Sequence, residues 1–232
     1  MISVVIPSFN EAERIEGCLV SLLEQTLPRE RYEIIVVDGG SRDNTREIAE
    51  QYADRVFIQT SPKVGGARND GALQAAGDIL VTTDADTHLP PSWLEQIERD
   101  FADPGTVMVY GPVEPIERTL RNRFYLFLSN IFATAGYLTG TIYFTLGCNS
   151  AFRREAFIRA GMYRVSDAGD DLEIAHRMVK IGKIRYDRRL KVGFSMRRYD
   201  QFGAIKSIYE WFYIVLHGGD ADKYAYTRKE YK

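Results

Sequence analysis

Two acidic residues one position apart are the clearest candidates for chemistry in the sequence. Asp84 and Asp86 form a D-A-D motif directly after the apolar run Ile79–Thr82. Because carboxylate oxygens are preferred ligands of hard divalent cations, this motif could hold Mn²⁺ or Mg²⁺ against the phosphates of a nucleotide. About one D-x-D triplet is expected by chance in a chain of this composition. A second triplet, at 220–222, lies in a Gly-rich polar tail and is interpreted as solvated surface.

Polar residues also follow the first two strand-like runs. PSFNE at 7–11 ends the first run, and DGGS at 38–41 ends the second. In an open parallel α/β sheet, ligands bind beyond the carboxyl ends of the strands. A carboxylate there can accept hydrogen bonds from a ribose hydroxyl or a base N–H. Taken singly, Asn10, Ser41 and Asp43 are more simply interpreted as helix caps and turn formers. Three polar strand ends at one edge favour a binding site.

The elements that must position these residues alternate along the first hundred residues. Short apolar runs predict strands, and apolar residues at helical spacing predict the helices between them. This alternation indicates an α/β fold with a Rossmann-like, mostly parallel sheet and helices on both faces. The predicted strands are Ile2–Ile6, Tyr32–Val37, Val56–Gln59 and Ile79–Thr82, and the predicted helices are Glu11–Gln25, Asn44–Tyr52 with Asp43 as N-cap, Gly65–Ala76 and Trp93–Phe101.

Composition excludes several classes of protein. The 232 residues are 45% hydrophobic and 27% charged, which is typical of a globular chain and not of a disordered one. With 30 Lys and Arg against 32 Asp and Glu, the formal net charge is −2, and no general field would attract nucleic acid. The two cysteines, Cys18 and Cys148, form neither a disulfide framework nor a zinc motif. No basic segment or cleavage signal marks the N-terminus, so a cytoplasmic location is expected.

Five linked blocks give the sequence a wider resemblance. They are VVIPSFNEAERI, VVDGGSRDNT, VGGARNDGALQAAGDILVTTDAD, GCNSAFRREAF and GDDLEIAHRMVKIGKIRYD. Over roughly residues 2–190 the chain resembles a family 2 glycosyltransferase of the GT-A fold, and five blocks in this order are far more specific than any single one. The resemblance implies inverting transfer of a sugar from a nucleotide diphosphate-sugar to a hydroxyl or lipid-phosphate acceptor. It also implies a nucleotide-sugar lobe at 1–110, a smaller acceptor lobe at 111–195, and a C-terminal helix and tail at 196–232.

The resemblance also implies roles at the strand ends. Asp38 would hydrogen-bond the base, Asp84 would approach the ribose or a metal-bound water, and Asp86 would coordinate Mn²⁺ or Mg²⁺. Arg68 would lie near the nucleotide or its diphosphate, where a permanent cation is useful. Without the surrounding blocks, Arg68 would be interpreted as a surface partner of Asp70 or Asp78. The implied donor-nucleotide residues are Pro7, Asn10, Glu11, Asp38, Gly40, Arg68 and Asp84.

An inverting transfer also needs a base that takes the proton of the acceptor. The family places this base in an acidic pair that opens a helix, which corresponds here to Asp170 and Asp171. We assign Asp171 as the catalytic base and Asp170 as a neighbour that raises its pKa by like-charge repulsion. The same pair would also stabilise the helix N-terminus, and both roles can hold at once.

Two positions depart from the family pattern. Gly39 stands where a second acid is often found, although Asp38 remains. Many relatives carry a metal-binding His after the last strand, and this chain has Ser195 near that position. His217 is a remote replacement. The metal would then rest on Asp86, phosphates and water, with Arg197 or Arg198 supplying extra positive charge.

Residues 124–152 contain no Asp, Glu, Lys or Arg. The stretch exceeds the roughly 20 residues that a membrane-spanning helix needs. Its polar residues and its overlap with the GCNSAFRREAF block nevertheless exclude a transmembrane helix. Two interpretations remain: a buried part of the acceptor lobe, or an interfacial surface with aromatic residues and flanking arginines. An aromatic-rich helix at 205–216 supports peripheral contact with the cytoplasmic face of a membrane.

Several alternatives stay open at this stage. The expected donor is a UDP-sugar, or else a GDP-sugar, and the acceptor is a saccharide or a polyprenyl-linked species. No G-x-G-x-x-G or G-x-x-x-x-G-K-[ST] loop is present, so the usual backbone cradles for phosphate are missing. A sugar-1-phosphate nucleotidyltransferase would need a Gly-rich basic loop after the first strand, where this chain has SFNEAERIEG. A non-catalytic nucleotide-sugar-binding module would keep the fold without turnover.

Overall fold

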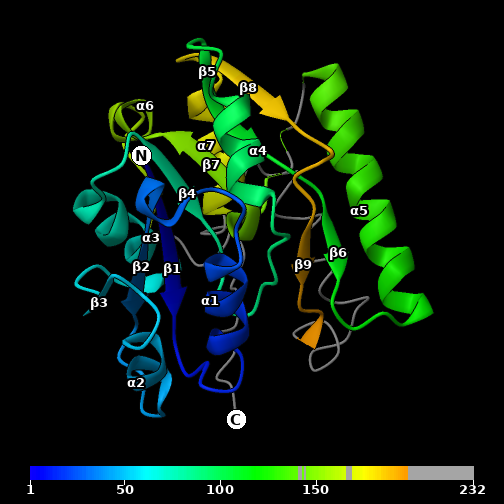
Figure 1. Ribbon diagram of the computed structural model, residues 1–232. Coiled ribbons are helices and arrows are strands. Elements are labelled where there is room, and N and C mark those ends of the chain that lie inside the picture. The colour runs from blue at the N-terminus through cyan, green and yellow to red at the C-terminus, as the bar shows by residue number, and fades with distance from the viewer. Residues whose placement is uncertain (141–142, 144, 166–168, 198–232) are drawn as a thin grey trace.

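A seven-stranded sheet runs through the centre of the computed structural model, which describes residues 1–140, 143, 145–165 and 169–197 (Figure 1). The strand order is β3-β2-β1-β4-β7-β5-β8. Only β7 runs against its neighbours β4 and β5, and the other pairs in this sheet are parallel. The strands are β1 Ile2–Ser8, β2 Tyr32–Asp38, β3 Arg55–Ile58, β4 Ile79–Thr82, β5 Thr106–Tyr110, β7 Ser150–Arg153 and β8 Lys183–Tyr186.

Helices cover both faces of this sheet because its strands are apolar on both sides. Val4 and Ile6 of β1 belong to a core cluster that includes residues of α1, α2 and α4, whereas Val5 belongs to a second cluster that includes residues of α3, α6 and α7. These alternating residues are fully buried, as expected for a parallel sheet covered on both faces. The helices are α1 Ile15–Leu23, α2 Thr45–Ala49, α3 Lys63–Gln74, α4 Trp93–Asp100, α5 Leu120–Thr139, α6 Arg154–Arg159 and α7 Asp170–Met178, with 3-10 turns η1 Arg29–Arg31 and η2 Gly147–Asn149.

A second, two-stranded sheet pairs β6 (Val113–Pro115) with β9 (Val192–Phe194) in parallel. Helix α5 lies beside β6 at the outer edge of the molecule (Figure 1). The Asn130 side chain of α5 both accepts from the Val113 N–H, at 3.2 Å, and donates to the Val113 carbonyl, at 2.8 Å. One amide therefore replaces a missing strand neighbour and fixes the helix against β6.

The predicted α/β architecture is confirmed, and the differences are local. Helix α1 begins at Ile15 and not at Glu11, because the backbone before it forms a turn in which the Arg14 N–H donates to the Glu11 carbonyl. The strands β5 and β6 were not predicted, since they lie beyond the strand–helix alternation of the first hundred residues. The predicted lobes at 1–110 and 111–195 share one sheet, because β7 lies between β4 and β5.

The uncharged stretch at 124–152 contains several elements. It comprises most of α5, a loop, η2 and most of β7. Among the described residues, no helix combines the length and apolar character needed to cross a membrane. The predicted helix at 205–216 lies outside the described residues.

The close seating of α3 on the sheet gives a stability prediction. A Cβ added at Gly71 would lie 2.3 Å from Val5 Cγ1 and 3.1 Å from Val37 Cγ2, so Gly71→Ala forces α3 away from a buried sheet face. We expect it to lower the free energy of unfolding by about 1–3 kcal/mol, measured by urea denaturation. Gly17→Ala is the matched control, because nothing lies within 4 Å of its added Cβ in helix α1. The control should stabilise the chain by about 0.5–1 kcal/mol. Equal stability of Gly71→Ala and the wild type would show that α3 is not seated this closely.

Candidate functional site

The loops that leave β1 and β2 are tied together by hydrogen bonds. The Asn10 N–H donates to Ser41 Oγ at 2.9 Å, and Asn10 Oδ1 accepts from the Arg42 N–H at 2.9 Å. The Glu11 N–H donates to Thr45 Oγ1 at 2.8 Å. Asn10 adopts a φ of 53°, a left-handed conformation that asparagine tolerates better than most residues. The edge predicted to hold the donor is thus a single connected surface, with Pro7 at the end of β1 beside Val37 of β2.

Asp38 is fully buried and holds the turn that follows β2. Its Oδ1 accepts from the N–H groups of Gly40, at 2.9 Å, and Ser41, at 2.8 Å. Its Oδ2 accepts from Ser41 Oγ at 2.5 Å and from Ser8 Oγ at 3.3 Å. Gly40 has a φ of 86°, which a residue with a side chain adopts only with strain. Asp38 therefore stabilises this turn, in addition to its predicted contact with the base.

Packing explains why a glycine, and not a second acid, stands at position 39. A Cβ at Gly39 would lie 3.2 Å from Phe9 Cδ2 and 3.3 Å from the Ser8 carbonyl oxygen. The Phe9 ring is about half exposed, at 49%, and it lies on the backbone of this glycine. Gly39 therefore gives the aromatic ring room to cover the turn.

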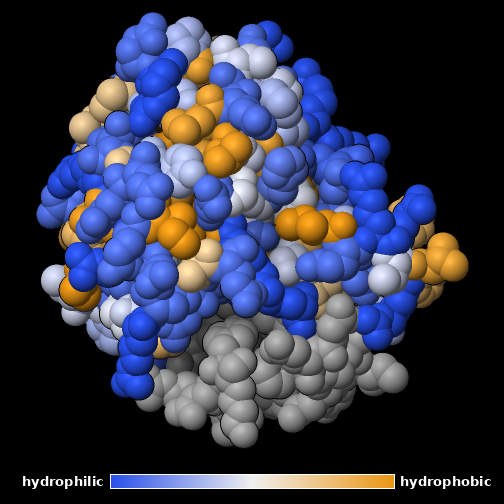
Figure 2. All heavy atoms as spheres, turned by 60° about the horizontal axis from the view of Figure 1, so that its bottom comes forward, coloured by the Kyte–Doolittle hydropathy of each residue, from blue (hydrophilic) through white to orange (hydrophobic). Residues whose placement is uncertain are grey.

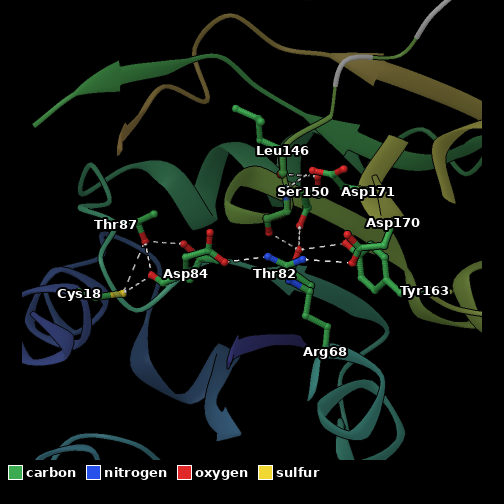
Figure 3. A network of polar contacts seen from close by, with 12 residues as sticks. Cys18, Arg68, Thr82, Asp84, Thr87, Leu146, Ser150, Tyr163, Asp170 and Asp171 are labelled. Carbon is green, nitrogen blue, oxygen red and sulfur yellow. Dashed lines mark hydrogen bonds and ion pairs between the residues drawn. The ribbon is translucent and has the colours of Figure 1, made fainter. Parts of the chain in front are cut away.

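Residues that sequence reasoning did not identify fix the D-A-D loop after β4 (Figure 3). Thr87 Oγ1 donates to the Asp84 carbonyl at 2.6 Å and contacts Thr83 Oγ1 at 2.7 Å. The Cys18 thiol donates to the same carbonyl at 3.4 Å. Burial raises the pKa of Cys18 to about 12, so the thiol stays neutral and serves as a donor. A threonine after D-x-D was visible in the sequence, whereas the contribution of Cys18 from α1 was not.

Arg68 of α3 joins the D-A-D loop to the acidic pair of α7. Its Nη2 lies 2.8 Å from Asp84 Oδ1, and its Nη1 lies 3.4 Å from Asp170 Oδ2 (Figure 3). The arginine is 5% exposed, and its guanidinium carbon is 5.6 Å from the centre of the Tyr163 ring. A Cβ at Gly147 would lie 2.3 Å from Nη2, so the backbone of η2 lies directly against the guanidinium. The interpretation of Arg68 as a surface partner of Asp70 or Asp78 is wrong.

The acidic pair opens α7, as the sequence predicts. Asp171 Oδ2 accepts from the Gly147 N–H at 3.1 Å, and Oδ1 accepts from the Leu172 N–H at 2.9 Å. Burial, with a further contribution from the negative charge of Asp170, raises the pKa of Asp171 to about 7. Burial also raises the pKa of Asp170, although Arg68 acts in the opposite direction. A carboxyl group with a pKa near neutrality can accept a proton at physiological pH.

A second arginine connects the remaining predicted acids. Arg197, three residues beyond β9, pairs through Nη2 with Glu11 and through Nε with Asp86 Oδ2, the latter at 3.2 Å. Glu11 and Asp86, which are 75 positions apart in the sequence, are thereby brought to one guanidinium. The cation suggested for Arg197 from the sequence is therefore placed beside the predicted metal ligand.

The described part of the site offers few protein ligands to a metal ion. Within the described residues, no group of three His, Cys, Asp or Glu side chains gathers at a point where it could hold a metal. Ser195, at the position of the missing His, donates to Glu117 Oε1 at 3.1 Å. Asp86 can contribute one carboxylate, and the other ligands would come from a bound diphosphate and water. Arg198 and His217 lie outside the described residues.

Comparison with known proteins identifies the family of the chain. The model of the family "Glycosyl transferase family 2" matches residues 3–161. The chain is 40% identical over 119 residues to glycosyltransferase AglE of Haloferax volcanii, covering 49% of this chain and 39% of that protein. It is 36% identical over 101 residues to the dolichol-phosphate mannosyltransferase of Pyrococcus furiosus, covering 41% of this chain and 28% of that protein. The chain therefore spans well under half the length of these relatives.

Solved structures show the same fold. The mannosyltransferase PcManGT from Pyrobaculum calidifontis, in complex with GDP-Man and Mn²⁺, is 26% identical with a TM-score of 0.64, covering 83% of this chain and 56% of that one. S. aureus TarS 1-349, in complex with UDP-GlcNAc, is 17% identical with a TM-score of 0.65, covering 84% of this chain and 58% of that one. From the family match and the GT-A fold of these neighbours, the chain belongs to glycosyl transferase family 2.

Proposed function

We propose that this chain is an inverting, metal-dependent glycosyltransferase that uses Asp171 as its base. The observation that carries the proposal is the pair of contacts made by Arg68, which joins the D-A-D loop and the acidic pair in one buried network. The chain would move a sugar from a nucleotide diphosphate-sugar to a hydroxyl or lipid-phosphate acceptor. Membership in the family favours sugar transfer over the nucleotidyltransferase alternative.

The donor would bind across the loops that follow β1, β2 and β4. A UDP-sugar is the proposed donor and a GDP-sugar the alternative, since one neighbour binds UDP-GlcNAc and another binds GDP-Man. The connected Asn10–Ser41 and Glu11–Thr45 hydrogen bonds preorganise this edge for a nucleoside. The proposed donor-binding residues are Pro7, Asn10, Glu11, Asp38, Gly40, Arg68 and Asp84.

A divalent cation, Mn²⁺ or Mg²⁺, would be held by Asp86 together with donor phosphates. When bound, such an ion stabilises the negative charge that grows on the leaving diphosphate. Asp86 already contacts Arg197, so the guanidinium and the metal would share one carboxylate. Arg68, held against Asp84, would contribute further positive charge near the donor.

Asp171 would accept the acceptor's proton at a carboxylate oxygen. Each of its oxygens accepts one backbone N–H, so the carboxylate is held in a fixed orientation. A pKa of about 7 leaves a substantial ionised fraction at neutral pH and makes the group a stronger base than an ordinary aspartate. Asp170, which contacts Arg68, would act through Asp171 as a positioning residue.

The acceptor is proposed to be a saccharide or a polyprenyl-linked species. One relative is a dolichol-phosphate mannosyltransferase, which supports the lipid-linked alternative. A peripheral position on the cytoplasmic face of a membrane would suit such an acceptor.

Asp171→Asn separates an enzyme from a non-catalytic binding module. We expect sugar transfer to fall by about 10²–10⁴-fold, the usual contribution of a general base. Binding of UDP- or GDP-sugars, measured by calorimetry, should stay close to that of the wild type. Asp103→Asn is the control, because Asp103 pairs with Lys183 at the surface. Undiminished transfer by Asp171→Asn would rule out this base.

The raised pKa of Asp171 predicts opposite pH trends for activity and stability. The ionised base accumulates as pH rises, so kcat/KM should increase through about pH 7 and then level off. Between an ordinary aspartate pKa of about 4 and the folded value, the folded chain binds more protons than the unfolded chain, and stability falls as pH rises. Asp171→Asn should therefore lose less stability than the wild type between pH 5 and pH 8, as judged by melting temperatures. Parallel curves for both chains would contradict the raised pKa.

Arg197 gives a test of the metal site that does not depend on activity. Arg197→Gln removes the guanidinium that contacts the Asp86 carboxylate, so Mn²⁺ should bind the nucleotide-free chain about tenfold more tightly, equivalent to about 1.4 kcal/mol. Electron paramagnetic resonance of free Mn²⁺ measures this affinity. Arg189→Gln, which removes an ion pair with Asp187, should leave it unchanged. Equal Mn²⁺ affinity for wild type and Arg197→Gln, or an unchanged affinity in Asp86→Asn, would place the metal elsewhere.

A further inference from the structure

Helix α5 exposes an apolar face to solvent. Leu120, Phe124, Phe127, Ile131 and Leu138 are exposed, with fractions of 86% for Leu120, 60% for Phe127 and 75% for Leu138. At 100° per residue these five positions lie along one side of the helix, over a length of about 27 Å. The buried residues of α5, on other sides of the helix, are Asn122, Leu126, Ala133 and Gly136.

This pattern is the reverse of an ordinary surface helix. Such a helix buries its apolar stripe and presents charged residues to water. Figure 2 shows orange apolar side chains at the right-hand edge of the molecule, the side on which Figure 1 places α5, next to blue hydrophilic ones. Nothing in the described residues covers this face, and an apolar surface of this length indicates a contact with another phase or molecule.

Positively charged residues cluster beside this face, at the start of α5. Arg118, Arg121 and Arg123 are exposed at the start of α5, and the helix contains no Asp or Glu. Positive charge at a helix N-terminus is unfavourable to the helix dipole, so helix stability does not explain these residues. The acid Glu114 lies 3.9 Å from Arg118, and the carboxylate of Glu117 accepts from the Met196 N–H.

A groove between β6 and α5 combines the two properties. It has a volume of about 640 Å³. Val113, Phe124 and Phe127 give it apolar walls. Its charged residues are Arg118, Arg123, Lys191 and one acid, Glu114, so the lining carries a net positive charge. An amphiphilic anion, with an apolar body and a phosphate head, matches this lining better than a neutral or cationic partner.

We propose that α5 and this groove form a docking surface for a bilayer that contains anionic phospholipids. The helix would lie in the plane of the interface, with Leu120, Phe124 and Phe127 entering the acyl region and the arginines meeting headgroup phosphates. An anionic surface complements the charge here, whereas a second copy of the chain would bring the same cationic cluster to the contact. This inference does not depend on the proposed transfer reaction.

The surface is physically joined to the candidate active site. The residue before α5, Thr119, caps the helix, and nearby Glu117 accepts from Ser195 Oγ at 3.1 Å and from the Met196 N–H at 2.8 Å. The next residue, Arg197, contacts Asp86 and Glu11. A bilayer under the start of α5 would therefore hold a lipid-linked acceptor at the edge of the donor site.

Vesicle flotation of the chain, without donor or acceptor, tests the proposal. We expect the chain to float with vesicles of phosphatidylcholine containing about 30% phosphatidylglycerol, and to bind about tenfold less to phosphatidylcholine alone. Phe124→Ser/Phe127→Ser and Arg121→Glu/Arg123→Glu should each lower binding by about tenfold or more. Leu23→Ser/Leu73→Ser, which changes exposed leucines on α1 and α3, is the matched control and should bind like the wild type.

Each outcome has one meaning. Circular dichroism melts verify that the variants fold, which is expected because the changed side chains are exposed. Absence of binding to any vesicle, or equal binding of the control and the α5 variants, would overturn the proposal. A dimer in sedimentation velocity that dissociates in Phe124→Ser/Phe127→Ser, without vesicle binding, would assign the face to a second copy. Transfer to a water-soluble acceptor should be unchanged in the α5 variants, so a failure of docking remains distinct from a failure of the proposed reaction.

Discussion

The buried guanidinium of Arg68 is the interaction on which the rest of the site depends. A cation with 5% exposure is tolerated only when carboxylates compensate for its lost hydration, and Asp84 and Asp170 do so from opposite sides. Removing one partner of such a buried pair typically costs about 3–5 kcal/mol. The surrounding residue types follow from this requirement: Gly147 leaves room for the planar group, and Tyr163 covers it with an aromatic face. The fold and the candidate chemistry are therefore stabilised by the same contacts.

Much of the first half of the molecule could be predicted from the sequence. The β-branched runs of β1, β2 and β4 can be recognised in the sequence because strands buried on both faces are continuously apolar. The family blocks likewise identified the D-A-D loop and the acidic pair. Strands β5 and β6 were not predicted because they follow one another without an intervening helix, outside the strand–helix alternation that identified the earlier strands. For Arg68, local spacing suggested a surface pair, since the partner 102 positions away is visible only in the folded chain.

The two arginines of the site have different environments and different consequences. Arg68 is enclosed by α3, η2 and α7, so its contacts are part of the folded core. Arg197 is 17% exposed at its side chain and joins loops that the donor itself would touch. Sequence reasoning suggested positive charge near Arg197 but could not indicate its partners, because Glu11 and Asp86 come from separate strand ends. A rigid inner cation and a more accessible outer one thus border the same acidic loop.

The antiparallel strand β7 has a consequence for the evolution and dissection of the chain. It crosses from the second half of the sequence to hydrogen-bond with β4 of the first half, so the two halves close one continuous sheet. A fragment that stopped at Tyr110 would leave β4 with unpaired backbone groups and an open edge, which is a template for aggregation. The β6–α5 segment lies outside this sheet, since β6 pairs only with β9 among the described strands, so replacement of that segment would leave the seven strands intact whereas recombination of whole halves would not.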